Sequence, residues 1–137
     1  MSVITPVTDR AVGTTYGAPW FPETEDDKAA VQEQLDRLLA NPAFKNSKRY
    51  PALLRFAVER VLAGYTDSVK ERTIGVEVFH RNPNYDTNQD PVVRTTAVEV
   101  RKRLAQYYAD PEHSGELRIE FPAGSYMPEF HMPVPAD

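Results

Sequence analysis

The chain has 137 residues, of which 41% are hydrophobic and 26% charged, and its net charge is −4. These values are typical of one folded domain and exclude wholesale disorder. The absence of cysteine excludes disulfides, thiolate nucleophiles and cysteine-ligated metal centres. No apolar run has the length of a membrane span and no secretory signal is visible, so we expect a cytoplasmic protein that makes no membrane contact.

The charges are distributed unevenly along the chain. Residues 45–108 carry twelve basic and seven acidic side chains, a net charge of +5, whereas residues 1–44 carry −4 and residues 109–137 carry −5. A basic centre between acidic flanks is typical of a protein whose field draws a polyanion onto one face. The same pattern also arises by chance in a chain this short, so the charge distribution leaves both interpretations open.

Residues 1–25 are rich in Thr, Pro and Gly and show no periodicity, which predicts a flexible N-terminal arm. The folded domain is expected over residues 26–132, with a short tail at 133–137. Two large aromatic side chains, Trp20 and Phe21, interrupt the polar arm. Such residues dock on the chain's own domain or on a partner protein.

Two helices are predicted in the first half of the chain. The first begins at Thr24 or Asp26 and ends at the Asn-Pro pair 41–42, with apolar residues at helical spacing between them. The second follows Ser47, a suitable N-cap, and stops at Gly64. Because its apolar residues cover much of its circumference, we expect the second helix to lie at the centre of the core.

Two more helices are predicted in the second half. A short one spans residues 68–79 and is weakened by Gly75, and a polar loop follows over residues 81–89. Asp90 and Pro91 form a strong helix start for a fourth helix that ends at Tyr108.

This fourth helix is amphipathic. Its apolar seam is formed by Val93, Ala97, Val100, Leu104 and Tyr107 or Tyr108. The predicted outer surface has a net charge of +3 and comprises Arg94, Thr95, Thr96, Val98, Glu99, Arg101, Lys102, Arg103 and Gln106.

A β-hairpin is predicted at residues 117–130, where ELRIEF and YMPEF are joined by a turn that contains Gly124. Pro128 in the return segment favours an edge strand. The expected fold class is therefore mainly α with a small β-hairpin. Three to four helices followed by a hairpin is the element order of a winged helix-turn-helix.

Two segments carry a resemblance to a known family. VEVRKRL at residues 98–104 and IEFPAGSYMPEF at 119–130 resemble the C-terminal half of OmpR/PhoB-type winged-helix DNA-binding domains. The basic run 101–103 matches the end of that family's recognition helix, and Gly124 and Tyr126 match its wing. The match covers about the last third of the chain. The wing here is one residue shorter and has no Arg or Lys at its tip, and the family's N-terminal sheet has no visible counterpart.

The resemblance and the basic helix both favour a cytoplasmic transcription regulator that binds double-stranded DNA as a homodimer or cooperative assembly. The helix 91–108 would lie in the major groove, and the hairpin 117–130 would be the wing. The residues expected to read bases are Arg94, Thr95, Val98, Arg101 and Lys102. The residues expected to hold phosphates are Lys48, Arg49 and Arg103, with Lys45 beside them.

A protein-interaction module of the same shape, which does not bind DNA, is the alternative. The acidic flanks, the uncharged hairpin tip, Glu99 and the exposed Val98 favour it, and the segment around Trp20 and Phe21 would dock the partner. No motif supplies catalytic residues, so no enzyme activity and no cofactor is expected. The three histidines, at positions 80, 113 and 131, have no partner at helical ligand spacing, so no metal site is expected either.

Overall fold

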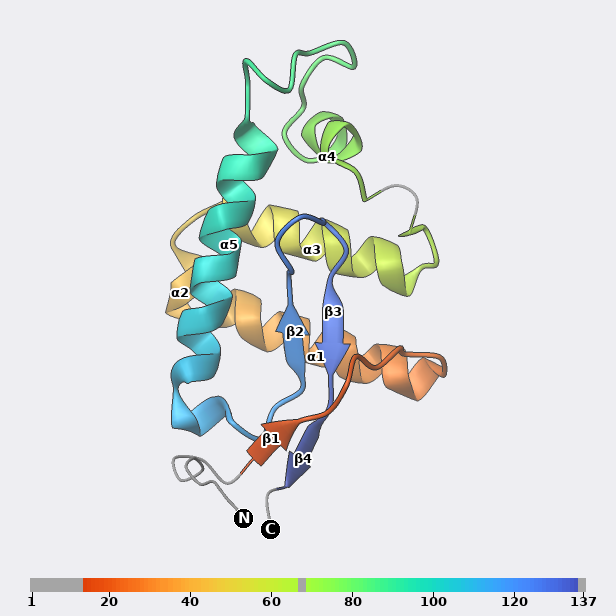
Figure 1. Ribbon diagram of the computed structural model, residues 1–137, viewed down its shortest axis with the longest axis vertical. Coiled ribbons are helices and arrows are strands. Elements are labelled where there is room, and N and C mark those ends of the chain that lie inside the picture. Colours follow the sequence, from red (N-terminus) through yellow and green to blue (C-terminus); the bar gives the residue numbers. More distant parts are fainter. Residues whose placement is uncertain (1–13, 67–68, 136–137) are drawn as a thin grey trace, which may run out of the picture.

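The computed structural model describes residues 14–66 and 69–135 (Figure 1). Within these residues the chain is mainly helical and has two small antiparallel sheets. The helices are α1 (Glu25–Ala40), α2 (Pro42–Lys45), α3 (Arg49–Leu62), α4 (Glu71–Glu77) and α5 (Val92–Ala109), and a 3-10 turn follows at Pro111–His113. The strands are β1 (Thr14–Tyr16), β2 (Arg118–Glu120), β3 (Glu129–His131) and β4 (Pro133–Pro135).

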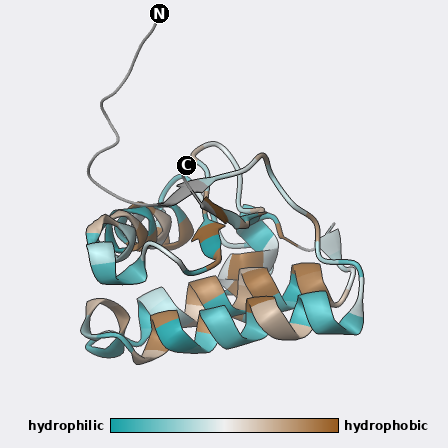
Figure 2. Ribbon diagram, turned by 90° about the horizontal axis from the view of Figure 1, so that it is seen from below, coloured by the Kyte–Doolittle hydropathy of each residue, from teal (hydrophilic) through white to brown (hydrophobic). Residues whose placement is uncertain are grey.

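The core lies where α5 crosses α3 and packs on α2 and strand β2, and where α1 packs on α2, α3 and β2 (Figure 1). Leu35, Leu53, Val58, Val100 and Ile119 are fully buried there. Figure 2 shows the apolar sides of the helices turned inward and their hydrophilic sides turned outward. Among the described residues, no helix has both the length and the apolar character needed to cross a bilayer.

Local signals fix the ends of the first two long helices close to the predicted positions. Thr24 caps α1: its hydroxyl accepts a hydrogen bond from the amide of Asp27, whose carboxylate accepts one from the amide of Thr24. Helix α3 begins two residues after Ser47, whose hydroxyl accepts from the amide of Arg49. Gly64 follows the C-cap with a φ of 89°, which glycine adopts without strain.

The structure differs from the predictions between α1 and α5. The one-turn helix α2 was not predicted, and α4 is shorter than the predicted span 68–79. Asp90 does not cap α5, because its carboxylate lies 2.6 Å from Nε of Arg81 in an ion pair. The N-cap position is Pro91, which makes no side-chain cap bond.

Part of the predicted arm is paired to the other end of the chain. Strand β1 pairs with β4, and the amide of Trp20 donates to the carbonyl of Phe130 at 2.7 Å. Trp20 packs against the core, whereas Phe21 is 74% exposed. Residues 14–25 and 133–135 were predicted to belong to a flexible arm and a tail, but they include β1 and β4, which pair with each other. This pairing satisfies the backbone hydrogen-bonding groups of both segments. Residues 1–13 and 136–137 of these predicted segments lie outside the described residues.

The predicted hairpin is present as β2 and β3, with Ile119 opposite Phe130 and Glu120 opposite Glu129. Ile119 and Phe130 are buried, while the flanking strand residues are partly exposed. Pro128 precedes β3 rather than lying inside it.

Candidate nucleic-acid interface

The apolar seam of α5 is buried as predicted, and one side of the helix faces solvent. Thr96 was predicted on the outer surface, but it is only 3% exposed. It lies three residues after Val93 and four before Val100, so it shares their side of the helix. The residues of α5 that remain well exposed before its last turn are Thr95, Val98, Lys102, Ala105 and Gln106.

Arg101 is directed at the hairpin rather than at solvent. Its Nε donates to the carbonyl of Phe121 at 2.7 Å, and its Nη2 donates to the carbonyls of Pro122 and Ser125 at 3.3 and 3.1 Å. The guanidinium also lies 5.4 Å from the ring centre of Phe121. Arg101 therefore fastens the turn between β2 and β3 to α5, and these bonds use the N–H donors of Nε and Nη2.

Arg94 links the beginning of α5 to α4. Its Nη2 donates to the carbonyl of Thr87 at 2.6 Å, and its Nη1 lies 3.4 Å from the carboxylate of Glu71. This arginine, which was predicted to read bases, thus holds the turn between α4 and α5 in place.

Lys102 and Arg103 share one carboxylate. Glu99 lies 3.3 Å from Nζ of Lys102 and 3.8 Å from Nη2 of Arg103. Arg103 also donates to the carbonyl of Ala43 at 2.8 Å and lies over the ring of Tyr50 at 4.6 Å. Ion pairs at a solvated surface contribute about 0 to 1 kcal/mol, so Lys102 and Arg103 can turn from Glu99 to another anion at little cost, while the Glu99 carboxylate remains beside them.

Three cations cluster where α2 gives way to α3, and we call Lys45, Lys48 and Arg49 the cationic corner. All three side chains are exposed, and within residues 14–66 and 69–135 none of them forms an ion pair. The first turn of α3 contains no acidic residue, so the positive end of the helix dipole adds to their field. Because Arg103 touches both Ala43 and Tyr50, the corner lies beside the middle of α5 (Figure 1).

A groove of about 350 Å³ separates α5 from the hairpin turn. Its lining comprises Arg94, Val98, Arg101, Gly124, Ser125 and Tyr126. Gly124 at the tip has a φ of 85°, which favours glycine there. Both guanidiniums at the groove are already hydrogen-bonded within the protein, but only that of Arg94 is paired with a carboxylate, so Arg101 still contributes positive charge to the groove.

A buried polar network holds the second half of α5 against α1. Its centre is the carboxylate of Glu116, which accepts hydrogen bonds from the hydroxyl of Tyr107 and from Nε2 of Gln34 at 2.9 Å, and which lies 2.8 Å from Nδ1 of His113. Gln34 is fully buried. Burial pushes the pKa of Glu116 upward, but the three hydrogen bonds outweigh it and hold the pKa below its usual value. Burial and the neighbouring carboxylate raise the pKa of Tyr107.

The structure divides the eight predicted contact residues into three groups. Thr95 and Val98 lie on the exposed side of α5. Arg94 and Arg101 are engaged in internal hydrogen bonds. Lys48 and Arg49 belong to the cationic corner and Arg103 contacts residues beside it, while Lys102 shares the exposed side of α5 with Thr95 and Val98.

One cluster was missed from the sequence: Glu120, Glu129 and His131 lie together on the hairpin. The three histidines have no metal-ligating partner at the i, i+4 spacing of a helix, but strand spacing gives His131 one. The alternation of Glu129 and His131 along a strand was the usable signal.

No family model, curated protein or solved structure matches this chain. Its function therefore has to be inferred from its own residues.

Proposed function

We propose that the chain is a winged helix-turn-helix module that binds double-stranded DNA. In this proposal α4 and α5 form the helix-turn-helix pair, and the hairpin of β2 and β3 is the wing. The proposal is supported by the packing of α4 and β2 on the same helix α5 and by the exposed side that α5 retains.

The cationic corner is the observation that carries the proposal. Lys45, Lys48 and Arg49 are exposed, and Arg103 contacts Ala43 and Tyr50, which flank them in the sequence. Glu99 pairs with Arg103 and with Lys102. Contacts with phosphates supply most of the affinity of a DNA-binding protein, and lysine and arginine make them. The local charge suits this role although the whole chain is acidic.

The roles of individual residues change from those predicted from the sequence. Arg94 and Arg101 become positioning residues, and base edges are left to Thr95, Val98 and Lys102. A helix with so few base-reading groups discriminates weakly between sequences on its own. Two copies on adjacent half-sites therefore remain the arrangement that we propose for useful specificity.

Removing two cations from the corner is expected to weaken DNA binding strongly. In the double variant Lys45→Gln/Lys48→Gln, we expect the affinity for a mixed-sequence duplex to fall by about 10- to 100-fold at roughly 0.1 M salt, because each phosphate contact contributes about 0.9 to the slope of log K against log salt. The slope itself should fall by about 2. Fluorescence anisotropy at several salt concentrations measures both quantities.

Lys28→Gln is the control, since it removes a positive charge from the first turn of α1, where Lys28 pairs with Glu25 at 3.8 Å. It should change neither affinity nor slope appreciably. Arg101 is unsuitable as a test residue, because its loss would release the hairpin turn. The proposal would be refuted if the affinity for DNA did not change with salt concentration. It would also be refuted if Lys28→Gln weakened binding as much per charge removed as the double variant does.

A protein-binding module is the second candidate, and Val98 favours it. This side chain is 52% exposed in the middle of α5, and small or uncharged residues such as Ala105 and Gln106 continue the same side. The corresponding expectation is self-association through α5, with a dimer in sedimentation experiments that Val98→Asp converts to a monomer. Lys45→Gln/Lys48→Gln should leave that dimer intact. A monomeric parent chain at tens of micromolar would exclude self-association through this side of α5.

A further inference from the structure

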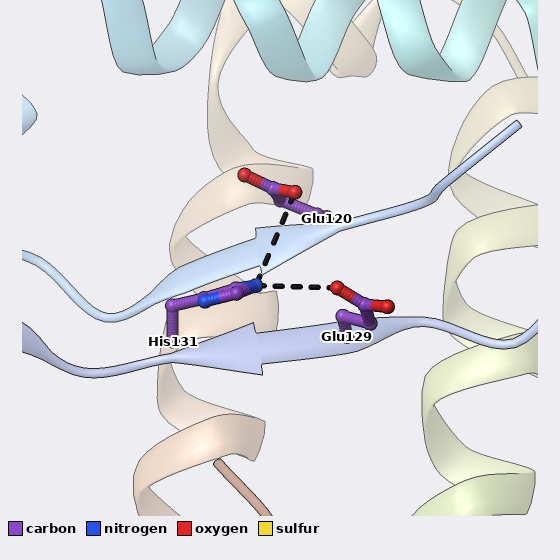
Figure 3. A group of neighbouring side chains, drawn as sticks. All are labelled: Glu120, Glu129 and His131. Atoms are coloured by element: carbon purple, nitrogen blue, oxygen red, sulfur yellow. Dashed lines mark hydrogen bonds and ion pairs between the residues drawn. The ribbon is translucent and has the colours of Figure 1, made fainter. Parts of the chain in front are cut away.

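Three side chains of the kinds that bind metals lie together on the β2–β3 hairpin (Figure 3). Glu120 and Glu129 are opposite each other in the strand register, and His131 follows Glu129 by two residues, so the three side chains share one face of the hairpin. The buried Ile119 and Phe130 occupy the other face. The ligand atoms of the three residues lie within 4.8 Å of one another.

The imidazole of His131 is oriented with Nε2 toward both carboxylates. Its Nδ1 lies 2.8 Å from the carbonyl oxygen of Gly17, which can only accept a hydrogen bond, so Nδ1 carries the proton. In the neutral ring the lone pair is then on Nε2. A backbone carbonyl that fixes the tautomer in this way is the usual outer support of a metal-binding histidine.

The distances suit a shared cation. Nε2 of His131 lies 3.3 Å from Oε1 of Glu129 and 4.0 Å from Oε1 of Glu120. Two ligand atoms bound at about 2.0–2.1 Å to one tetrahedral ion are roughly 3.3 Å apart. A small inward rotation of Glu120 would therefore complete the set.

The local charges also favour a cation at this position. Two glutamates directly opposite each other on paired strands destabilise the pairing unless positive charge lies between them. Arg118 offsets part of this charge, since its Nε lies 2.8 Å from Oε2 of Glu120. The guanidinium of Arg118 is retained over the rings of Tyr16 and Tyr108, at 5.5 and 5.1 Å, which leaves Oε1 of Glu120 facing His131.

We propose that Glu120, Glu129 and His131 bind a divalent transition-metal ion of the zinc type. One imidazole nitrogen and two carboxylate oxygens form a donor set that such ions accept. The glutamate side chains are 40% and 44% exposed, so water completes the coordination, whereas the His131 side chain is only 13% exposed. The site ties β3 to β2 and, through Gly17, to the segment after β1. It does not depend on the proposed DNA binding.

The test is calorimetric titration of the full chain with Zn²⁺ in the absence of DNA. We expect one site per chain with a dissociation constant in the micromolar range. His131→Asn and Glu129→Gln should each weaken binding at least tenfold. A rise in melting temperature with Zn²⁺ should be seen for the parent chain and lost in both variants. Cobalt substitution gives an independent readout, since a bound imidazole and carboxylates produce visible absorption bands.

His80→Asn is the matched control. His80 is exposed and has a φ of 57°, a conformation that asparagine tolerates, so the change removes an imidazole without disturbing the hairpin. It should leave Zn²⁺ binding unchanged. Circular dichroism without metal verifies that each variant is folded. Binding weaker than millimolar, or binding that survives both cluster variants in folded protein, would overturn the proposal.

Discussion

Replacing Gly75 with alanine is expected to destabilise the protein by about 2 kcal/mol, although a change from glycine to alanine within a helix usually stabilises it. A Cβ at position 75 would lie 2.1 Å from the hydroxyl oxygen of Tyr85 and 2.6 Å from its Cζ. Tyr85 cannot withdraw easily, because Arg72 lies over its ring at 5.5 Å and donates to its carbonyl at 2.7 Å. Overpacking of this kind costs about 1–3 kcal/mol, which exceeds the gain of up to about 1 kcal/mol in helix propensity. Urea denaturation measures the difference in the free energy of unfolding.

Gly115→Ala is the control for Gly75, because nothing lies within 4 Å of the added Cβ and the backbone there is not left-handed. Its effect should be within about 0.5 kcal/mol. Replacing Tyr85 with alanine should remove the clash, so that Gly75→Ala no longer destabilises in that background. A Gly75→Ala chain more stable than the parent would show that the contact with Tyr85 is absent.

Replacing Glu116 with alanine is the second large effect, with an expected loss of about 2–4 kcal/mol in the free energy of unfolding. The change takes away the acceptor for the Tyr107 hydroxyl and for Nε2 of Gln34, and an unsatisfied buried polar group costs about 1–3 kcal/mol. Gln34 retains Tyr108 as a partner at 3.2 Å, which limits the loss.

The pH dependence gives a separate test of the Glu116 network. Because folding lowers the pKa of Glu116, its ionised form stabilises the folded state above the usual glutamate pKa of 4.5, and this contribution is lost as the pH falls through the pKa of the folded state. Glu116→Gln should therefore be less stable than the parent at pH 7, and the difference should shrink toward pH 3. Glu112→Gln, at an exposed carboxylate in the preceding 3-10 turn, is the control and should change stability at pH 7 little. A constant difference across this range would mean that the charge of Glu116 does not matter.

The parts of the fold that could be predicted from the sequence are those governed by neighbouring residues. Thr24 and Asp27 form reciprocal capping hydrogen bonds at the start of α1, and Gly64 follows α3 in a left-handed conformation. The start of α1 and the end of α3 can therefore be predicted from a few adjacent residues. The buried apolar seam of α5 was predicted from the helical spacing of its apolar residues. The pairing of β1 with β4 could not be predicted in this way, since it joins residues more than a hundred positions apart.

The candidate site was less predictable than the fold, because helical periodicity gives the side of a helix but not the partner of a side chain. Asp90 has the sequence of a helix cap, yet Arg81 engages its carboxylate. Arg101 and Lys102 are adjacent and chemically similar, but one is bonded to the hairpin turn and the other is exposed. The cluster around His131 depends on strand register, which only the pairing of β2 with β3 establishes.

The three carbonyl contacts of Arg101 have a mechanical consequence. These hydrogen bonds join the hairpin turn and the centre of α5 into one rigid unit, because neither can move relative to the other without breaking bonds to the Arg101 guanidinium. A partner that meets this side of the molecule encounters a shape that is already set. Association then loses little conformational entropy, and the free energy of contact is retained as affinity.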